Sequence, residues 1–182
     1  MVLGCGDSGI AQKLQRAFTV PFFRAYTSED IAGVELGGAL KNIYALAAGA
    51  SDGLGLGDNA KSALVTRALV ELGRLGVALS GRRETFMGLS GVGDLMVTCF
   101  SLHSRNRGIG ERLGKGERWS EISKTFKQAV EGTVTALSAV ELAERYKVSL
   151  PISTEVHAIL YKDKDARAAL KDLLSRPVKE EA

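Results

Sequence analysis

The sequence predicts a mainly α-helical fold that is preceded by a short β-α-β segment. Apolar residues recur at the helical period in one stretch after another from residue 33 onward. Strand-like patterns occur only before residue 30, on both sides of one amphipathic stretch. Residues that begin or end helices stand between the periodic stretches. We therefore expect a helical bundle with a small strand-containing unit on its N-terminal side.

The composition is that of an ordinary globular protein. The chain has 182 residues, of which 45% are hydrophobic and 25% charged, so it can form a sizeable core and disorder is not expected. The net charge of +3 is too small to predict nucleic-acid binding. No apolar run reaches the roughly 18 residues of a membrane span, and the N-terminus lacks a secretory pattern. We expect a cytoplasmic protein without nucleic-acid or membrane partners.

The cysteines and histidines predict neither a disulfide framework nor a metal site. Cys5 and Cys99 are too few and too far apart in the sequence, and reduced thiols fit them better. His103 and His157 show no metal-ligand spacing with cysteine or acidic residues. We therefore predict that the protein binds no structural metal.

The first 30 residues contain a formal G-x-G-x-x-G pattern at Gly4, Gly6 and Gly9. A helix is expected at 7–18 and a strand at 22–26, and an acidic pair follows the glycines by about 20 residues, as in a dinucleotide-binding fingerprint. Only three residues precede Gly4, however, so the first strand would be a stub. One strand-helix-strand unit also lacks the crevice that a dinucleotide needs. We interpret these glycines as structural.

The stretch 33–52 is the central helix of the prediction, with a core-facing stripe formed by Leu36, Leu40, Ile43 and Ala47. The neighbouring stripe is mostly glycine and alanine, and includes Gly37, Gly38 and Lys41. Two adjacent glycines destabilise a helix, so we expect another backbone or a ligand to approach them closely. Lys41 would lose hydration there and become a usable base. The alternative is a lysine that extends its charged end into solvent.

Two long helices are expected around a glycine-rich link. Gly53, Gly55 and Gly57 suit a link better than a phosphate cradle, because nothing requires their amides to converge on a helix start. The second helix is expected at 60–79, with its apolar residues at Leu64, Ala68, Leu72, Leu75 and Leu79. Its outer side carries charges that we interpret as a solvated ladder of ion pairs, at Arg67, Glu71 and Arg74.

Two further helix starts carry side chains with possible chemistry. Asp94 follows a glycine-rich turn and opens the apolar helix 95–100, where it either serves as a simple cap or faces a substrate. Ser104 is a natural cap for a helix at 104–114, but Arg105 and Arg107 in its first turn oppose the helix dipole. Arginines suit that position if an anion binds there. The alternative is an exposed basic turn.

Three C-terminal helices complete the bundle. They are expected at 133–146, at 151–160 with Pro151 at the start, and at 165–174 with Asp165 as the cap. The tail at 179–182 is expected to fray.

Five separated motifs remain to be interpreted together. They are Val-Glu-Leu-Gly-Gly-Ala-Leu-Lys-Asn-Ile-Tyr-Ala at 34–45, Ser-Asp-Gly-Leu-Gly-Leu-Gly-Asp-Asn-Ala at 51–60, Arg-Glu-Thr-Phe-Met-Gly-Leu-Ser-Gly-Val-Gly-Asp-Leu at 83–95, Ser-Arg-Asn-Arg at 104–107 and Val-Glu-Gly at 130–132. In order and spacing, these motifs resemble the bacterial NAD(P)-dependent glycerol-3-phosphate dehydrogenases, and the resemblance runs from about residue 22 to residue 176. The resemblance covers the C-terminal half of the family. It implies that residues 30–182 form a helical substrate domain of the 6-phosphogluconate dehydrogenase type. Residues 1–29 would then be a remnant, the β-α-β edge of a Rossmann sheet.

The resemblance also implies the site residues. Lys41 would be the catalytic base and would contact the substrate, together with Asp94 and the phosphate-binding residues Ser104, Arg105 and Asn106. The cofactor, NAD or NADP, would lie near Arg105, Ala129 and Glu131. For Glu131 the alternative is an ordinary acidic residue at a helix start.

The implied reaction is the reversible interconversion of sn-glycerol 3-phosphate and dihydroxyacetone phosphate, which feeds glycerophospholipid synthesis. Most of the family's nucleotide-binding domain is missing from this chain, so we expect the isolated fragment to be inactive. The alternative is a non-catalytic phosphate-binding or dimerisation module derived from the same domain. Strands that lack their sheet neighbours have exposed edges, and a homodimer is therefore expected.

Overall fold

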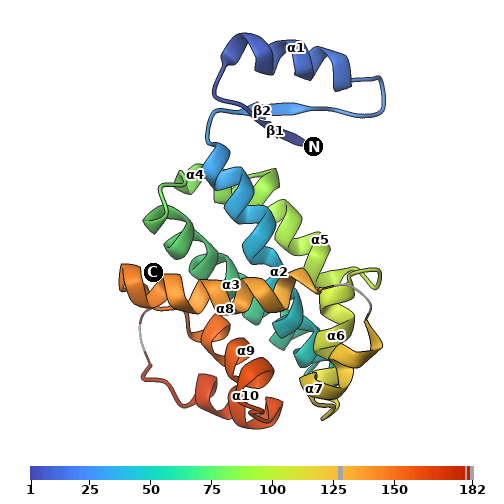
Figure 1. Ribbon diagram of the computed structural model, residues 1–182, viewed down its shortest axis with the longest axis vertical. Helices are drawn as coiled ribbons and strands as arrows, with labels where there is room; N and C mark the ends of the chain where they lie inside the picture. The colour runs from blue at the N-terminus through green and yellow to red at the C-terminus, as the bar shows by residue number, and fades with distance from the viewer. Residues whose placement is uncertain (127–128, 179, 181–182) are drawn as a thin grey trace.

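The computed structural model describes residues 1–126, 129–178 and 180. Helices make up most of it, and the mainly α-helical prediction is confirmed. Figure 1 shows a small β-α-β unit at one end and the helical part beneath it, joined through the start of helix α2. Of the tail that was predicted to fray, residues 179, 181 and 182 lie outside the described part of the chain.

The N-terminal unit consists of β1 (Val2–Gly4), α1 (Ser8–Phe18) and β2 (Tyr26–Ser28), and its two strands are parallel. The predicted strand at 22–26 is wrong, because β2 begins only at Tyr26. Val20 and Phe23 pair with each other through two backbone hydrogen bonds and thereby close a tight reversal. Pro21 favours this turn, which leaves Phe22 at its tip with 93% of its surface exposed.

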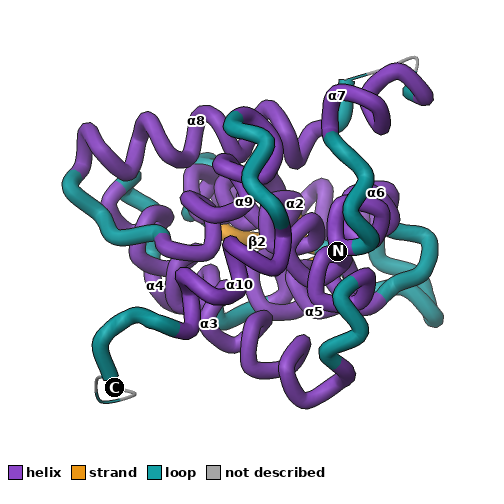
Figure 2. Tube along the Cα trace, turned by 90° about the horizontal axis from the view of Figure 1, so that it is seen from below, coloured by secondary structure: helices purple, strands orange, loops and turns teal. Residues whose placement is uncertain are grey.

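Helix α2 (Ile31–Gly53) is the centre of the helical part. Leu40, Ile43 and Ala47 are buried, which confirms the predicted core stripe. In Figure 2, which looks at the molecule from below, α2 lies among the other helices. It packs against the helices that follow it, which are α3 (Gly57–Ala78), α5 (Asp94–Phe100), α6 (Arg105–Gly114), α8 (Glu131–Tyr146) and α9 (Pro151–Tyr161).

The remaining elements are short or lie at the periphery. They are α4 (Arg83–Phe86), the π-helical turn η1 (Leu89–Gly93), α7 (Trp119–Ile122), the 3-10 turn η2 (Ser123–Thr125) and α10 (Ala166–Leu174). The predicted caps Ser104 and Asp165 accept hydrogen bonds from the first turns of their helices, and so does Asp30 at the start of α2. The glycine-rich stretch after α2 is a helix link, as expected, although α3 begins at Gly57 with Leu56 as its cap.

Helices α2 and α6 touch through their backbones. A Cβ atom on Gly49 of α2 would overlap the carbonyl oxygen of Arg107, and one on Gly110 of α6 would overlap the carbonyl oxygen of Leu46. Only glycine permits so close an approach. The first turn of α6, with Arg105 and Asn106, therefore lies directly beside the helix that carries Lys41.

The predicted ladder of ion pairs on the outer side of α3 is wrong at Glu71. This residue is 2% exposed, and its carboxylate accepts hydrogen bonds from the amides of Ile152 and Ser153 (2.6 and 3.1 Å) and from the Ser153 hydroxyl (3.1 Å). Burial raises the pKa of Glu71, and these hydrogen bonds oppose that rise. Glu71 thus takes the place of an N-cap for α9, whose own cap position, Leu150, has no side-chain acceptor.

In the part of the chain that the structure describes, no single helix is both long and apolar enough to cross a membrane. The segments Arg83–Phe100 and Arg105–Gly114 meet the length and composition criteria only as a pair, across a bend of 53°.

Replacing Asp30 by alanine is expected to lower the free energy of unfolding by about 2 kcal/mol at neutral pH. The carboxylate is buried and accepts from the amides of Gly33 (2.9 Å) and Arg82 (2.7 Å) and from the Thr85 hydroxyl (2.6 Å). Burial alone would raise the pKa of Asp30, but the three hydrogen bonds outweigh it and the pKa is lowered from 3.8.

A lowered carboxyl pKa stabilises the folded state above the unfolded-state value, and this stabilisation is lost as pH falls through the folded-state value. Urea unfolding from about pH 7 to about pH 2 should therefore show the difference between parent and Asp30→Ala shrinking at the acid end. The control is Asp165→Ala, which removes an exposed cap with two amide partners. Equal losses in both variants would contradict the special contribution of Asp30.

Candidate functional site

Lys41 and Asp94 form an ion pair between α2 and the first residue of α5. The Lys41 Nζ lies 2.5 Å from Asp94 Oδ2, and the two side chains are 21% and 32% exposed. The Thr98 hydroxyl donates to the Asp94 carbonyl oxygen (2.6 Å) and lies 3.4 Å from Asp94 Oδ1. Two predicted site residues that lie 53 positions apart in the sequence are therefore in direct contact and partly open to solvent.

The glycines of α2 explain how this pair forms. A Cβ atom on Gly37 would overlap the carbonyl oxygen of Ser90, so η1 lies directly against α2. This contact places Asp94, the residue after η1, opposite Lys41. A Cβ atom on Gly38 would meet nothing within 4 Å. The expected close approach to the glycine stripe is confirmed at Gly37, and Gly38 leaves open space near Lys41.

A chain of hydrogen bonds, formed mainly by polar side chains, connects α2, α6 and α8 beside this pair. Asn106 Nδ2 donates to Asn42 Oδ1 (3.0 Å), Asn42 Nδ2 donates to Glu131 Oε2 (3.2 Å), and the Gly132 amide donates to Asn106 Oδ1 (3.2 Å). Asn106 and Glu131 are therefore both hydrogen-bonded to Asn42, the residue that follows Lys41 in the sequence. Asn42 was not among the predicted site residues. Its signal in the sequence is a polar residue within the long apolar run of α2, because buried polar side chains require partners.

The first turn of α6 separates its two arginines. Ser104 caps the helix by accepting from the Arg107 amide (3.3 Å), as predicted. The Arg107 guanidinium is nine-tenths buried and forms an ion pair with Asp52 (2.6 Å). Arg105 is exposed and forms no ion pair with any described residue. Of the two arginines, therefore, Arg105 has its charge on the surface and Arg107 has its charge in the interior.

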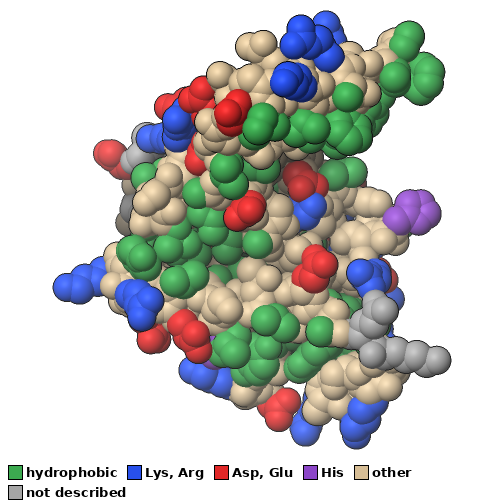
Figure 3. Space-filling view, turned by 45° about the horizontal axis from the view of Figure 1, so that its top comes forward, with side chains coloured by type: hydrophobic (Ala, Val, Ile, Leu, Met, Phe, Trp, Pro, Cys, Tyr) green, Lys and Arg blue, Asp and Glu red, His purple; other side chains and the backbone are tan. Residues whose placement is uncertain are grey.

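A cavity of about 380 Å³ opens beside Asp94, between the start of β1, helix α2, η1 and helix α5. Its walls combine polar groups with apolar side chains, which are those of Met1, Val2, Val34, Leu89 and Val97. Figure 3 shows hydrophobic side chains along the hollow between the N-terminal unit at the top and the helical part below, with a few charged side chains among them. The Lys41–Asp94 pair thus lies next to an open space with both apolar and polar walls.

The family model described as NAD-dependent glycerol-3-phosphate dehydrogenase C-terminus matches residues 30–171. The chain belongs to this family. Three comparisons describe its relatives. A glycerol-3-phosphate dehydrogenase (NAD(P)+) from Solidesulfovibrio magneticus is 49% identical over 181 residues, which are 100% of this chain and 55% of the relative. The enzyme of that name from Syntrophotalea carbinolica is 51% identical over 175 residues, 96% of this chain and 53% of the relative.

Among solved structures, glycerol-3-phosphate dehydrogenase from Coxiella burnetii aligns with a TM-score of 0.90 at 41% identity. The alignment covers 96% of this chain and 54% of the other. The chain therefore spans about half the length of the curated relatives it matches. These comparisons confirm the predicted resemblance and the helical fold with its β-α-β unit.

In this member of the glycerol-3-phosphate dehydrogenase family, two residues that are predicted to contact the cofactor lie at the start of α8 or just before it. Glu131 is the first residue of the helix, where its charge also complements the helix dipole. Ala129 is exposed and lies two residues earlier, directly after residues 127–128, which are outside the described part of the chain. Their contacts with a cofactor stay predictions.

Of the N-terminal glycines, Gly4 ends β1, Gly6 lies in the connection that follows, and Gly9 is in the first turn of α1. Asp7 caps this helix and accepts from the Ile10 amide at 2.8 Å. The amides at a helix N-terminus are the groups that bind a pyrophosphate in dinucleotide sites. In this chain the Asp7 carboxylate occupies that position.

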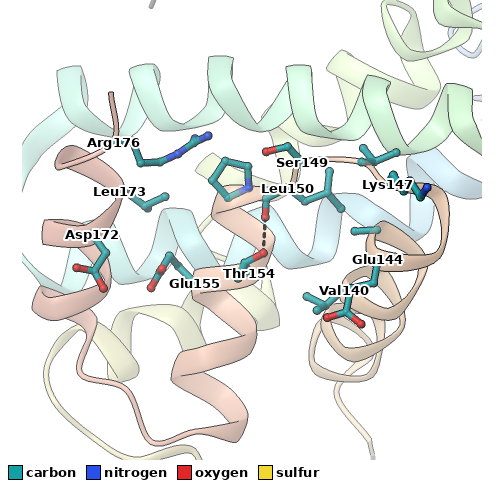
Figure 4. A pocket seen from close by; sticks show the side chains of 13 residues that line it. Val140, Glu144, Lys147, Ser149, Leu150, Thr154, Glu155, Asp172, Leu173 and Arg176 are labelled. Carbon is teal, nitrogen blue, oxygen red and sulfur yellow. Dashed lines mark hydrogen bonds between the residues drawn. The ribbon is translucent and has the colours of Figure 1, made fainter. Parts of the chain in front are cut away.

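A second cavity, of about 570 Å³, lies away from the predicted site. Figure 4 shows it between the end of α8, the start of α9 and α10, with Glu144, Lys147, Asp172 and Arg176 around it. It contains none of the predicted site residues. Among the described residues, no group of three or more His, Cys, Asp or Glu side chains is suited to hold a metal ion.

Proposed function

We propose that this chain is the substrate domain of an NAD(P)-linked glycerol-3-phosphate dehydrogenase. The reaction would interconvert sn-glycerol 3-phosphate and dihydroxyacetone phosphate. The observation that carries the proposal is the Lys41–Asp94 ion pair, which lies beside the open face at Gly38 and next to the Asn42–Asn106 contact. Helices α2, α5 and α6 would thus supply the base, the carboxylate and the anion-binding group that oxidation of a phosphorylated alcohol requires.

In the oxidising direction, Lys41 would take the hydroxyl proton while a hydride leaves the adjacent carbon. In the reducing direction it would return the proton. Asp94 would hold a substrate hydroxyl and keep the lysine in place, because the ion pair fixes the position of Nζ. The small residues around Lys41 would let the substrate carbon approach it.

The substrate phosphate would bind at the first turn of α6. The Arg105 guanidinium is exposed there, and the chain immediately after it is anchored because Asn106 is hydrogen-bonded to both α2 and α8. Planar guanidinium groups bind phosphate oxygens through paired hydrogen bonds. Ser104 and Asn106 would add polar contacts on either side of Arg105.

The nicotinamide cofactor would lie near Arg105, Ala129 and Glu131. When bound, it supplies the hydride acceptor or donor. These residues fit one part of a dinucleotide, because Arg105 and Glu131 expose polar groups next to the Lys41 site. At the start of the N-terminal helix, where a pyrophosphate would bind, the Asp7 carboxylate already accepts from the Ile10 amide. The proposal therefore assigns most cofactor binding to a nucleotide-binding half outside this chain, with residues 1–29 as its last β-α-β unit and 30–182 as the substrate domain.

The proposal extends to a cytoplasmic homodimer. The apolar side of α1 is exposed at Ile10, Leu14 and Phe18, and within the described residues the sheet consists of two strands. Such surfaces are covered in a working protein, by further strands or by a second copy. The second candidate function, a phosphate-binding or dimerisation module without turnover, would use the same surfaces.

The test measures NADH and NADPH oxidation that depends on dihydroxyacetone phosphate. The 182-residue chain is assayed alone and after mixing with the nucleotide-binding half of the Solidesulfovibrio magneticus relative. We expect turnover only in the mixture. Binding of sn-glycerol 3-phosphate without turnover in any mixture would favour the non-catalytic module. Absence of both binding and turnover would reject the proposal.

Replacing Arg105 by methionine is expected to raise the KM for dihydroxyacetone phosphate in this mixture by about ten- to a hundredfold, because a charge-assisted contact to the phosphate is lost. The matched control is Arg167→Met, since Arg167 is also an exposed arginine in the first turn of a capped helix, α10. An equal KM in both variants would contradict the role of Arg105.

A further inference from the structure

A cluster of buried charges joins the ends of three helices behind the proposed site. Lys61 Nζ of α3 and the Arg107 guanidinium of α6 both bind Asp52 Oδ2 near the end of α2, at 2.8 and 2.6 Å. The Lys61 and Arg107 side chains are only 5% and 11% exposed. We refer to Asp52, Lys61 and Arg107 as the charge cluster.

Other polar and aromatic groups lie around the cluster. Glu111 Oε2 lies 3.7 Å from the Arg107 guanidinium, and Glu111 Oε1 pairs with the exposed Lys115. Lys61 Nζ lies 4.8 Å from the ring centroid of Phe100, the last residue of α5. Arg107 Nε is buried without a hydrogen-bond partner among the described residues. Burial of the Arg107 guanidinium is thus only partly compensated, and buried ion pairs are by themselves weak evidence for stabilisation.

The cluster touches each helix that carries a proposed substrate contact. Helix α2 carries both Lys41 and Asp52, and α5 carries both Asp94 and Phe100. In α6, Arg105 directly precedes the buried residues Asn106 and Arg107. No hydrogen bond or ion pair between described residues joins the cluster to Lys41, Asp94 or Arg105. Any effect of the cluster on the substrate must therefore act through the placement of the helices.

The first turn of α6 is the part whose direction depends on the cluster. Successive residues of an α-helix lie about 100° apart around its axis. Asn106 is fixed by Asn42 and Gly132, and Arg107 is fixed by Asp52. Two anchors at different angles determine the rotation of the turn, and hence the direction in which Arg105 leaves the helix.

We propose that Asp52, Lys61 and Arg107 are positioning residues for phosphate binding. They hold Arg105 and Asn106 at the place relative to Lys41 that a phosphorylated three-carbon substrate requires. This inference rests on the proposed function, because it takes Arg105 as the phosphate contact.

The principal test is the double variant Asp52→Asn/Lys61→Met, which leaves the net charge unchanged. Glu111 stays available to Arg107, so no buried cation loses every partner. The matched control is Glu155→Gln/Lys164→Met. It removes a similar lysine-carboxylate contact between α9 and the segment before α10. A second variant, Arg107→Lys, keeps all charges but replaces the planar guanidinium, which can form paired hydrogen bonds, by an ammonium group.

Two measurements are made on the 182-residue chain. Amide hydrogen exchange compares the first and last turns of α6, and calorimetry gives the Kd for sn-glycerol 3-phosphate. In both cluster variants we expect exchange at the first turn to rise by about tenfold relative to the last turn, and Kd to rise by about tenfold, because misplaced contacts lose affinity steeply. The control variant should change neither quantity.

Each outcome decides the inference. Unchanged first-turn exchange in a folded double variant overturns it, as does faster exchange with an unchanged Kd. If the double variant does not fold, Arg107→Lys decides by the same two readouts. If the parent chain does not bind sn-glycerol 3-phosphate and also shows no turnover in the mixture, the proposed function is rejected. The exchange measurement then still shows by itself whether the cluster fixes this turn.

Discussion

Replacing Lys41 by methionine is expected to lower turnover of dihydroxyacetone phosphate by about 10²- to 10⁴-fold in the complemented enzyme, with little change in stability. Methionine keeps the length and packing of the lysine stem but can neither accept nor return a proton. The ion pair that it removes is partly exposed at both ends, so its loss costs about 1 kcal/mol or less. The measurements are the steady-state rate in both directions and thermal unfolding of the variant.

Two further variants separate proton transfer from charge. Lys41→Arg keeps a cation opposite Asp94, but an arginine does not give up its proton in a protein, so we expect it to be nearly as inactive as the methionine variant. Lys115→Met removes an exposed lysine that pairs with Glu111, and full activity is expected. Substantial turnover in Lys41→Met would show that another group carries the proton.

Local chemistry in the sequence was sufficient to predict most helices and their starts. The caps Ser104 and Asp165 act within their own first turns, and Pro151 occupies the first turn of α9. Such features need no knowledge of the rest of the fold. The strand predicted at 22–26 could not be judged locally. Its aromatic residues fit a strand pattern, but in the structure residues 20–23 form a short reversal around Pro21.

The site was predictable from the sequence only through the family resemblance. Nothing in the spacing of Lys41 and Asp94 shows that they meet, because their contact depends on how η1 packs against α2. Asn42 and Glu71 were missed for the same reason. Their partners lie 64 and 81 residues away, and a helical period shows which residues share a face but not which element covers it. Glu71 was consequently assigned to solvent when it is a buried acceptor.

That correction leads to the largest stability effect that we expect. Replacing Glu71 by alanine should lower the free energy of unfolding by about 3–5 kcal/mol. The substitution leaves two buried amides of α9 and the Ser153 hydroxyl without their acceptor, and it opens a void beside Tyr44 and Ser153. Urea unfolding measures the loss. The control is Glu141→Ala on the exposed side of α8, which should change stability by less than about 0.5 kcal/mol.

The variant Glu71→Gln tests whether the buried group titrates. Burial raises the pKa of Glu71 above its ordinary value of 4.5, so the folded state binds this proton more tightly than the unfolded chain does. The parent should therefore gain stability as pH falls from above the folded-state pKa toward 4.5, whereas glutamine gains none from this position. The free energy of unfolding of the parent minus that of Glu71→Gln should therefore increase as pH falls over that range. A difference that stays constant with pH would mean that Glu71 has the same pKa in both states, and its burial would then be fully offset by the hydrogen bonds from α9.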